Sequence, residues 1–150
     1  MSDDSFAPTT DRPVRFECVV PILRVSDLRA SVRWYGAMFG LATDWEWGID
    51  KAHPTMASVS RDGCAVMLCQ QDQGQGCAWA WFGVADVVPL YEELRAKGAD
   101  VLQPPTNYSW AYEIRVEDPD GNVLRFGSEP RTDQPFQDAS PARASAVLDD

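Results

Sequence analysis

Histidine is nearly absent from this sequence of 150 residues, in which His53 is the only one. Long apolar runs are absent as well, because no stretch approaches the roughly 18 residues needed to cross a bilayer. The first residues, MSDDSFAPTTDRP, are acidic and polar, whereas a secretory signal is basic and then apolar. These absences predict a soluble cytoplasmic protein without a membrane partner.

Cysteine is sparse, and its spacing matches no metal or disulfide motif. The sequence has four cysteines, and none forms a CxxC pair. Three of them lie in apolar, strand-like runs, so neither a zinc knuckle nor a disulfide framework is expected. We therefore predict reduced, packed thiols at Cys18, Cys64, Cys69 and Cys77.

Basic residues are outnumbered, with 13 Lys and Arg against 23 Asp and Glu and a formal net charge of -10. An acidic body repels phosphate backbones, and no basic stripe offsets that repulsion, so no nucleic-acid partner is expected. A cationic ligand is favoured at long range. An acidic surface that only keeps the protein soluble explains the charge equally simply.

Two segments of the sequence occur twice in altered form. RDGCAVML at 61–68 returns as PDGNVLRF at 119–126, and RVSDL at 24–28 returns as GVADV at 83–87. The offset is 58 residues for the first pair and 59 for the second. Self-similarity at a fixed spacing indicates one supersecondary unit used twice. We expect the two copies to form a cleft between them.

The first copy, residues 18–70, predicts one strand, one helix and three further strands. The alternating segment ECVVPILRV forms the first strand. Ser26 is the expected N-cap of a helix that runs to about Phe39 and stops at Gly40. The remaining strands are expected at 41–48, 55–60 and 64–70.

The second copy, residues 77–129, repeats this order after the linker QQDQGQG. CAWAWFGV forms its first strand, Asp86 caps its helix, and Gly98 ends the helix. Three strands follow at 100–103, 111–117 and 123–127. The sequence thus predicts an α+β fold of tandem βαβββ modules, with a curved mixed sheet backed by the helices.

The segments outside the two copies have the composition of flexible chain, rich in Asp, Thr, Ser and Pro. We predict a flexible N-terminal arm at 1–17, a single domain at 18–129 and a disordered C-terminal tail at 130–150.

Over residues 18–129 the sequence resembles the vicinal oxygen chelate superfamily of glyoxalases, extradiol dioxygenases and bleomycin-resistance proteins. The resemblance rests on VPILRVSDLRASVRWYGAMFG, SRDGCAVML, DVVPLYEELRAKGA and EDPDGNVLRF, which occur in this order. Trp110 and Glu113, placed before DPDGN, and the VP opening of the first strand are most similar to the bleomycin-resistance type. Those proteins hold a cationic antibiotic between two subunits without turnover. The resemblance therefore implies a homodimer with an intersubunit site, and Pro21 fits the arm exchange seen in that group.

Metal-dependent members of the superfamily take their ligands from four strand positions that face the cleft. By the resemblance, these positions are Val20, Met67, Trp79 and Arg125 in this chain. Valine, tryptophan and arginine offer no oxygen or imidazole donor, and methionine alone does not hold a divalent ion. His53 lies in a loop outside these positions. We expect no metal and no other cofactor.

Aromatic residues lie near the positions that carry metal ligands in other members of the superfamily. Alternation along CAWAWFGV turns Trp79 and Trp81 toward the cleft. Flat indoles with a few charged groups suit a planar or cationic organic ligand. Each tryptophan alone also fits a packed core or dimer interface, and Glu113 fits either a ligand cation or an ion pair with Arg115 or Arg125. The predicted ligand-binding residues are Trp47, Trp79, Trp81, Tyr108, Trp110, Glu113, Arg115 and Arg125.

The predicted function is metal-independent binding and sequestration of an aromatic or cationic small molecule, antibiotics included, with no catalytic residue. Two alternatives stay open. One is a glyoxalase- or dioxygenase-like enzyme with an atypical metal or none, in which Glu113 acts as general base or joins His53 as a ligand. The other is a structural protein whose tryptophans are buried at a dimer interface.

Overall fold

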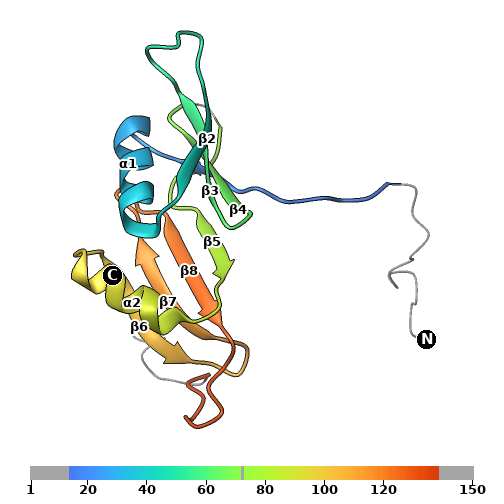
Figure 1. Ribbon diagram of the computed structural model, residues 1–150, viewed down its shortest axis with the longest axis vertical. Coiled ribbons are helices and arrows are strands. Elements are labelled where there is room, and N and C mark those ends of the chain that lie inside the picture. Colours follow the sequence, from blue (N-terminus) through green and yellow to red (C-terminus); the bar gives the residue numbers. More distant parts are fainter. Residues whose placement is uncertain (1–13, 72, 139–150) are drawn as a thin grey trace, which may run out of the picture.

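Two βαβββ repeats follow one another along the chain (Figure 1). The computed structural model describes residues 14–71 and 73–138. The first repeat comprises β1 (Ile22–Arg24), α1 (Leu28–Phe39), β2 (Ala42–Trp47), β3 (Met56–Arg61) and β4 (Cys64–Cys69). The second comprises β5 (Trp79–Gly83), α2 (Val87–Ala96), β6 (Val101–Asn107), β7 (Tyr112–Glu117) and β8 (Val123–Ser128). The predicted α+β class and the tandem modules are confirmed.

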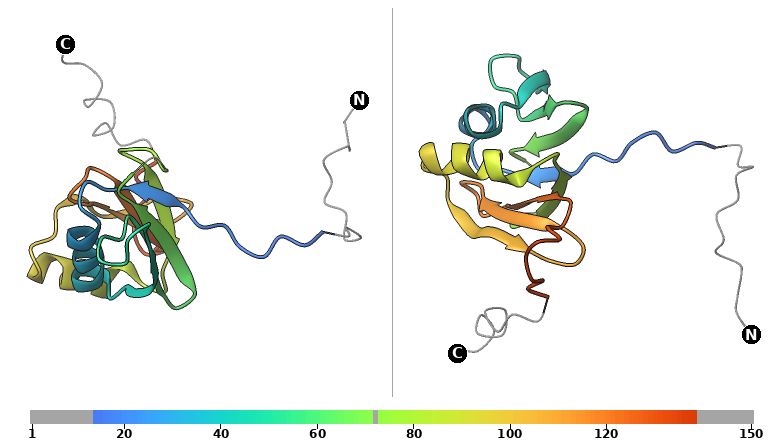
Figure 2. Two further views of the ribbon diagram at one scale, coloured as in Figure 1. Left: turned by 90° about the horizontal axis from the view of Figure 1, so that it is seen from above. Right: turned by 60° about the horizontal axis from the view of Figure 1, so that its bottom comes forward.

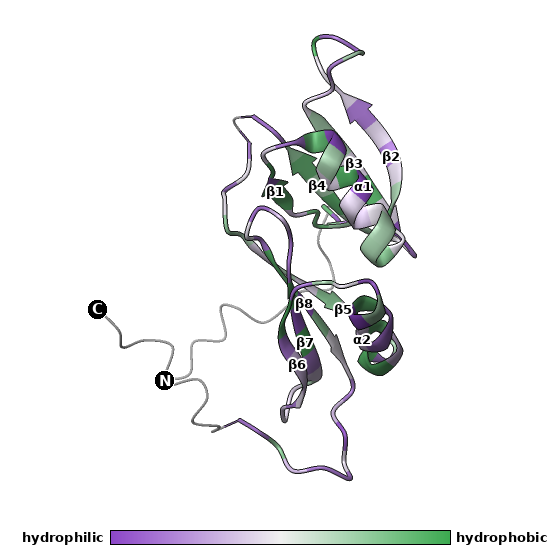
Figure 3. Cartoon of the chain, turned by 90° about the vertical axis from the view of Figure 1, so that its left-hand side faces the viewer, coloured by the Kyte–Doolittle hydropathy of each residue, from purple (hydrophilic) through white to green (hydrophobic). Residues whose placement is uncertain are grey.

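Each repeat forms its own four-stranded mixed sheet. The strand orders are β1-β4-β3-β2 and β5-β8-β7-β6, so the two repeats share one topology. In each sheet the first strand of the repeat runs parallel to the last, and the other pairs are antiparallel. Figures 1 and 3 show α1 and α2 covering the same side of the molecule, which leaves the other side of each sheet free of helices.

Aromatic rings pack where the two repeats meet. Phe39 of α1 lies 5.0 Å from Phe126 of β8, between ring centroids, and Phe126 stacks on Phe82 of β5 at 4.9 Å. The core extends from there under both helices, with Leu28 and Leu94 fully buried. Because one apolar cluster includes residues of both sheets and both helices, the repeats pack as a unit.

A polar junction, made of Tyr35, Asp118 and Asn122, also ties the two repeats together. The buried Asn122 side chain donates to the carbonyl of Arg24 and accepts from the backbone N–H of Ala78, each at 3.0 Å. Asp118 accepts from the Tyr35 hydroxyl at 2.7 Å and from the Asn122 amide at 2.8 Å. Burial, and then the negative charge of Asp118, raise the pKa of Tyr35. The segment PDGN, the counterpart of RDGC in the first repeat, was noted as part of the duplication, and its role as a link between repeats was not predicted.

Both helices begin at aspartate, which corrects one prediction. Asp27, rather than Ser26, is the N-cap of α1, and its carboxylate accepts from the N–H of Ala30 at 3.1 Å. The Ser26 N–H instead donates to Asp120 at 3.0 Å. Asp86 caps α2 as predicted, through the N–H of Val88.

The helix ends match the glycine positions of the sequence. Gly40 caps α1 in the left-handed conformation, with φ 67°. In α2 the cap is Lys97, and Gly98 follows it with φ 73°. Left-handed backbone is accessible to glycine without steric cost, so these two positions stop the helices.

Two strands differ in length from their predictions, for opposite reasons. β1 begins at Ile22, and the Pro21 carbonyl before it still accepts from the N–H of Met67 in β4 at 2.9 Å, whereas the residues before Pro21 extend away from the body of the molecule. β6 continues to Asn107 through Pro104 and Pro105. It lies at the edge of its sheet, where a proline need not donate to a neighbour, and its register shifts there.

Residues 14–20 extend away from the rest of the molecule, as the blue segment in Figure 2 shows. Their apolar side chains are exposed: Val14 by 69%, Phe16 by 91% and Val19 by 93%. Three of the four cysteines are also exposed, and Cys69 alone is buried, so the prediction of packed thiols is wrong for the others. The cysteines are unpaired.

Residues 131–138 are fixed to the second repeat, although the sequence placed them in a disordered tail. The buried Asn107 side chain donates to the carbonyl of Arg131 at 2.8 Å and accepts from the N–H of the same residue. Asp138 accepts from the N–H of Ser109 at 2.9 Å. One asparagine thus orders this segment, while the rest of the predicted tail and residues 1–13 lie outside the described chain.

Candidate functional site

The side of the second sheet that faces away from α2 carries aromatic and charged residues. Along β5, Ala80 is buried, whereas Trp79 and Trp81 are 56% and 55% exposed. The predicted alternation of this strand is confirmed. We call this side the open face; it carries Trp79, Trp81 and Gly83 of β5, Arg125 and Gly127 of β8, and Glu113 and Arg115 of β7.

Two glycines allow the Trp81 ring to lie against the sheet. A Cβ atom at Gly127 would come within 2.7 Å of the ring, and one at Gly83 within 3.3 Å. A side chain at Gly127 would therefore displace the indole. The indole N–H donates to Glu113 at 3.1 Å. Trp81 is held in one orientation with half of its surface still exposed.

Glu113 is fully buried and forms an ion pair with Arg125. Nη2 of Arg125 donates to both carboxylate oxygens, at 2.9 and 2.7 Å. The Arg125 side chain keeps 27% of its surface exposed, whereas the carboxylate keeps none. A buried charge without a partner is costly, so this pair fixes both side chains. Glu113 was expected either to contact a ligand cation or to pair with Arg115 or Arg125, and the structure shows the ion pair with Arg125.

Arg115 stacks on Trp79, with its guanidinium carbon 5.2 Å from the ring centroid. Arg115 is opposite Arg125 across β7 and β8, and Arg125 is opposite Trp81 across β8 and β5. Gln103 of β6 is opposite Arg115. Because opposed residues share a face of a sheet, one row crosses the open face. We call Trp81, Arg125, Arg115 and Gln103 the central row.

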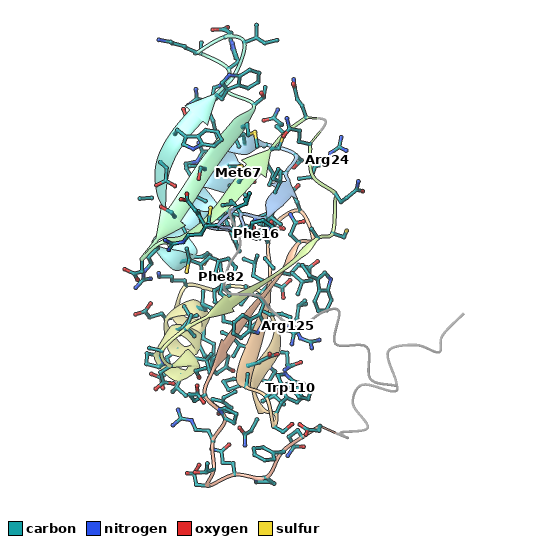
Figure 4. The ribbon with its side chains drawn as sticks, turned by 90° about the vertical axis from the view of Figure 1, so that its right-hand side faces the viewer. Phe16, Arg24, Met67, Phe82, Trp110 and Arg125 are labelled. Atoms are coloured by element: carbon teal, nitrogen blue, oxygen red, sulfur yellow. The ribbon has the colours of Figure 1, made fainter. Side chains whose placement is uncertain are left out.

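Tyr108 and Trp110 lie at the turn between β6 and β7. Their rings are parallel within 4° and 4.6 Å apart, and Trp110 is 51% exposed while Tyr108 is buried. Figure 4 shows Arg125 on the second sheet and Trp110 nearer this turn. Trp110 therefore presents an aromatic surface beside the sheet, and the Tyr108 ring supports it from beneath.

Trp47 belongs to the other sheet. It is the last residue of β2, an outer strand of the first repeat, and is 60% exposed. Of the predicted ligand-binding residues, the chain brings Trp79, Trp81, Glu113, Arg115 and Arg125 together on the open face. Tyr108 and Trp110 lie at the turn between β6 and β7, and Trp47 belongs to the other sheet.

The residues proposed for the enzymatic alternative do not meet. His53 lies in the loop after β2 and contacts Asp50 at 2.8 Å. This hydrogen bond, with one from the N–H of Ala52, lowers the pKa of Asp50. Glu113 lies in the second repeat, where Arg125 and Trp81 occupy its oxygens. A general base needs an oxygen within reach of a substrate proton, which Glu113 does not offer here.

The four positions that hold a metal elsewhere in the superfamily do not fit one in this chain. Val20 precedes β1, Met67 lies in β4, Trp79 in β5 and Arg125 in β8. One thioether is their only donor, and the Arg125 charge opposes a cation. Residues 14–71 and 73–138 contain no cluster of three His, Cys, Asp or Glu side chains suited to a metal.

A cavity of about 450 Å³ lies between the repeats. It is lined by Phe39, Phe82, Leu90 and Phe126, with Arg61 and Glu93 among its charged residues. Phe82 and Phe126 point to the opposite side of β5 and β8 from Trp81 and Arg125, so this cavity is separate from the open face.

Two residues of the site, Gly127 and Gln103, were not predicted; the alternation that turns Trp79 and Trp81 toward the cleft also places Gly83 there. Gly127 was detectable in principle, because an isolated glycine inside a strand indicates close approach of another group. Gly83 and Gly127 are opposite each other across β5 and β8, a relation that depends on sheet register. Gln103 carried no signal of its own.

The chain belongs to the glyoxalase/bleomycin resistance protein/dioxygenase superfamily, whose family model matches residues 15–126. This confirms the resemblance seen in the sequence. No helix within the described residues is long and apolar enough to span a membrane. The sequence matches no curated protein.

Solved structures share this fold. TioX from Micromonospora sp. ML1 is 22% identical with a TM-score of 0.65, covering 76% of this chain and 99% of its own. TnmS3, an antibiotic binding protein from Streptomyces sp. CB03234, is 20% identical with a TM-score of 0.64, covering 79% and 100%. A glyoxalase/bleomycin resistance protein/dioxygenase from Nocardioides is 21% identical with a TM-score of 0.59, covering 89% and 94%.

Proposed function

We propose that this protein binds a flat aromatic small molecule on the open face of the second sheet and holds it without chemical conversion. The observation that carries the proposal is the presentation of Trp79 and Trp81, each about half exposed on one face. Soluble proteins bury most large aromatic surface, so two neighbouring exposed indoles suggest a ligand or partner.

The surroundings of the indoles favour a ligand. The Trp81 ring is fixed by Gly127 and Glu113 before any ligand arrives, and Trp79 is backed by Arg115. Ordering a side chain in advance lowers the entropic cost of binding. TnmS3, described as an antibiotic binding protein, supports the view that this fold accommodates such ligands, and an antibiotic is the ligand class we propose.

We propose further that two copies of the chain form a homodimer and that each site is completed by the partner. The exposed apolar residues of the extended segment 14–20, which are Val14, Phe16 and Val19, support this because a second chain would cover them from water. Trp47, which stands apart from the open face in one chain, would then be available to a site built from two chains.

The test is calorimetric titration of metal-stripped protein with fused-ring aromatic compounds. Trp81→Ala, Trp79→Ala and Trp110→Ala should each weaken binding about fivefold or more, since an aromatic stacking contact contributes about 1 kcal/mol. Phe136→Ala is the control, because Phe136 is 52% exposed but lies in the C-terminal segment. Mass spectrometry should recover the bound compound unchanged.

Unaltered affinity in both Trp79→Ala and Trp81→Ala would remove the open face from the site. A ligand in the cavity between the repeats would give that result and would instead respond to Leu90→Trp. Stoichiometric metal in untreated protein, together with a converted compound, would identify an enzyme and contradict the proposal.

A further inference from the structure

The open face offers positive charge and hydrogen-bond donors at its centre. Two of the four residues of the central row are arginines, and a third is a glutamine whose amide donates. The whole chain carries a net charge of -10, which favours cations at long range. Charges more than about 10 Å away are largely screened at ordinary ionic strength, so the nearby groups decide for a bound ligand. These are Arg115 and Arg125 of the central row, with Glu113 and Glu117 in the rows on either side.

Glu113, the acid that the sequence offered to a ligand cation, is unavailable to one. Its side chain has no exposed surface, and both oxygens accept from Arg125, with a further bond from Trp81. A ligand that lies on Trp81 therefore meets the exposed part of Arg125 and not the carboxylate beneath it.

Arg125 retains unused donors. Both bonds to Glu113 come from Nη2 alone, and Nε is buried without a hydrogen-bond partner among the described residues. Gln103 Nε2, at the far end of the central row, is likewise buried without a partner there. These two atoms are buried, so the surface that a ligand acceptor reaches is the exposed 27% of the Arg125 side chain, outside its bonds to Glu113.

Resting on the proposed function, we infer that the ligand is an aromatic acid: a flat ring system that stacks on Trp81 and directs a carboxylate along the central row toward Arg125. Arginine pairs with carboxylates through charge-assisted hydrogen bonds, which are about twice as strong as neutral ones. The same geometry disfavours a cationic ring system, because its charge would lie against a guanidinium.

A second glutamate, Glu117, affects which end of the open face a ligand carboxylate would occupy. Glu117 of β7 lies on the same face as Arg115, opposite Val123 of β8, where Trp79 is also placed. It belongs to the row beyond Arg115, away from Trp81. At the Trp79 end a ligand carboxylate would meet Glu117 as well as Arg115, whereas at the Trp81 end it meets Arg125 above a buried Glu113. The Trp81 end is therefore the one we assign to the carboxylate.

The test compares three probes of one ring system in calorimetry on the full chain at neutral pH: 2-naphthoate, 2-naphthamide and 2-naphthylmethylammonium. Naphthoate should bind about tenfold more tightly than the amide, and the ammonium compound should bind more weakly than either. The indole N–H signal of Trp81, identified by its loss in Trp81→Phe, should shift in nuclear magnetic resonance spectra with naphthoate.

The matched variant is Glu113→Gln with Arg125→Met, which removes both charges and leaves no buried charge unpaired. It should reduce the ratio of naphthoate affinity to amide affinity from about ten to about one. This ratio is the readout, because any change in the orientation of Trp81 affects both probes alike. Arg125→Lys should retain part of the preference. Arg33→Met, which removes an exposed arginine from α1, should leave all three affinities unchanged.

The outcomes separate the two proposals. If the ammonium probe binds as tightly as naphthoate or more tightly, the inference of an aromatic acid is overturned while the aromatic binding face stands. If the double variant keeps the naphthoate preference, Arg125 is not its source and the inference also fails. If no probe shifts the Trp81 signal up to millimolar concentration, the proposed function itself fails.

Discussion

Tyr35 joins the two repeats through a single buried hydroxyl. Its ring contacts Trp34 edge-on at 5.0 Å between centroids, and its hydroxyl donates to Asp118. A tyrosine in this position must stay neutral, because its anion would lie buried beside a carboxylate. The pKa of Tyr35 is raised for this reason, first by burial and then by Asp118.

Tyr35→Phe should lower the free energy of unfolding at neutral pH by about 1.5 kcal/mol, the contribution of a hydrogen bond to a charged acceptor. The pH dependence follows from the direction of the shift. The unfolded pKa of tyrosine is about 10, so the stability that Tyr35 contributes is complete below that pH and is lost as pH rises above it. Urea unfolding at pH 8 and pH 10.5 measures both effects.

The variant should therefore lose less stability than the natural chain between those two pH values, because its phenylalanine has no proton to lose. The other three tyrosines are present in both proteins and cancel in the comparison. An identical loss in the two proteins would show that Tyr35 does not titrate against folding in this range.

At the residue scale, alternation along one strand predicted which way Trp79 and Trp81 point, since that depends only on the strand period. The partner of Glu113 was not predictable in this way. Arg115 and Arg125 both lie on its face, and the choice depends on the register between β7 and β8. Contacts within a strand are encoded locally, whereas contacts across strands require the assembled sheet.

At the scale of elements, the two helices begin in the same way, with an aspartate that accepts from a first-turn N–H. Asp27→Ala should lower the free energy of unfolding by about 1 kcal/mol, the usual cost of losing an N-cap side chain. Ser26→Ala should have little effect, because Ser26 contributes its backbone N–H to Asp120 and not a capping hydroxyl. Denaturant titration of both variants measures the two changes in the free energy of unfolding.

A larger loss in Ser26→Ala than in Asp27→Ala would restore serine as the cap. Asp86→Ala is not a clean comparison for α2, because Asp86 also receives a hydrogen bond from Arg131 at 3.2 Å.

Element boundaries were well predicted where glycine or a tight turn sets them, as for β3, β4 and α1. The boundaries were predicted wrongly where contacts with the rest of the molecule set the length of a strand. β1 is short because the chain before Pro21 extends away from the sheet, and β6 runs through two prolines because it is an edge strand. Residues 131–138 are ordered by the buried Asn107, and composition alone carries no sign of such an anchor.

At the scale of the whole molecule, the N-terminal arm exposes more apolar surface than a lone chain would keep in water. Replacing Val14, Phe16 and Val19 with serine should shift the proposed homodimer toward monomer, because a buried phenylalanine or valine contributes about 1.5 kcal/mol or more. Analytical ultracentrifugation across a dilution series measures the change in the dimer dissociation constant.

Ile49→Ser is the matched control, since Ile49 is 98% exposed in the loop after β2 and outside the arm. Equal dissociation constants for the arm variant and the control would exclude the arm from the dimer contact. A natural chain that is monomeric at all concentrations would contradict the homodimer itself.

The polar junction also has a consequence for the order in which contacts form during synthesis. Its hydrogen bonds connect residues far apart in sequence: 83 positions separate Tyr35 from Asp118, and 98 separate Arg24 from Asn122. The bond between Ser26 and Asp120 spans 94. The first repeat is able to pair β1 with β4 and to pack α1 on β3 and β4 by itself, but it lacks these bonds until the turn before β8 has left the exit tunnel. Although the chain is built from two similar halves, the last polar contacts of the first half depend on the second.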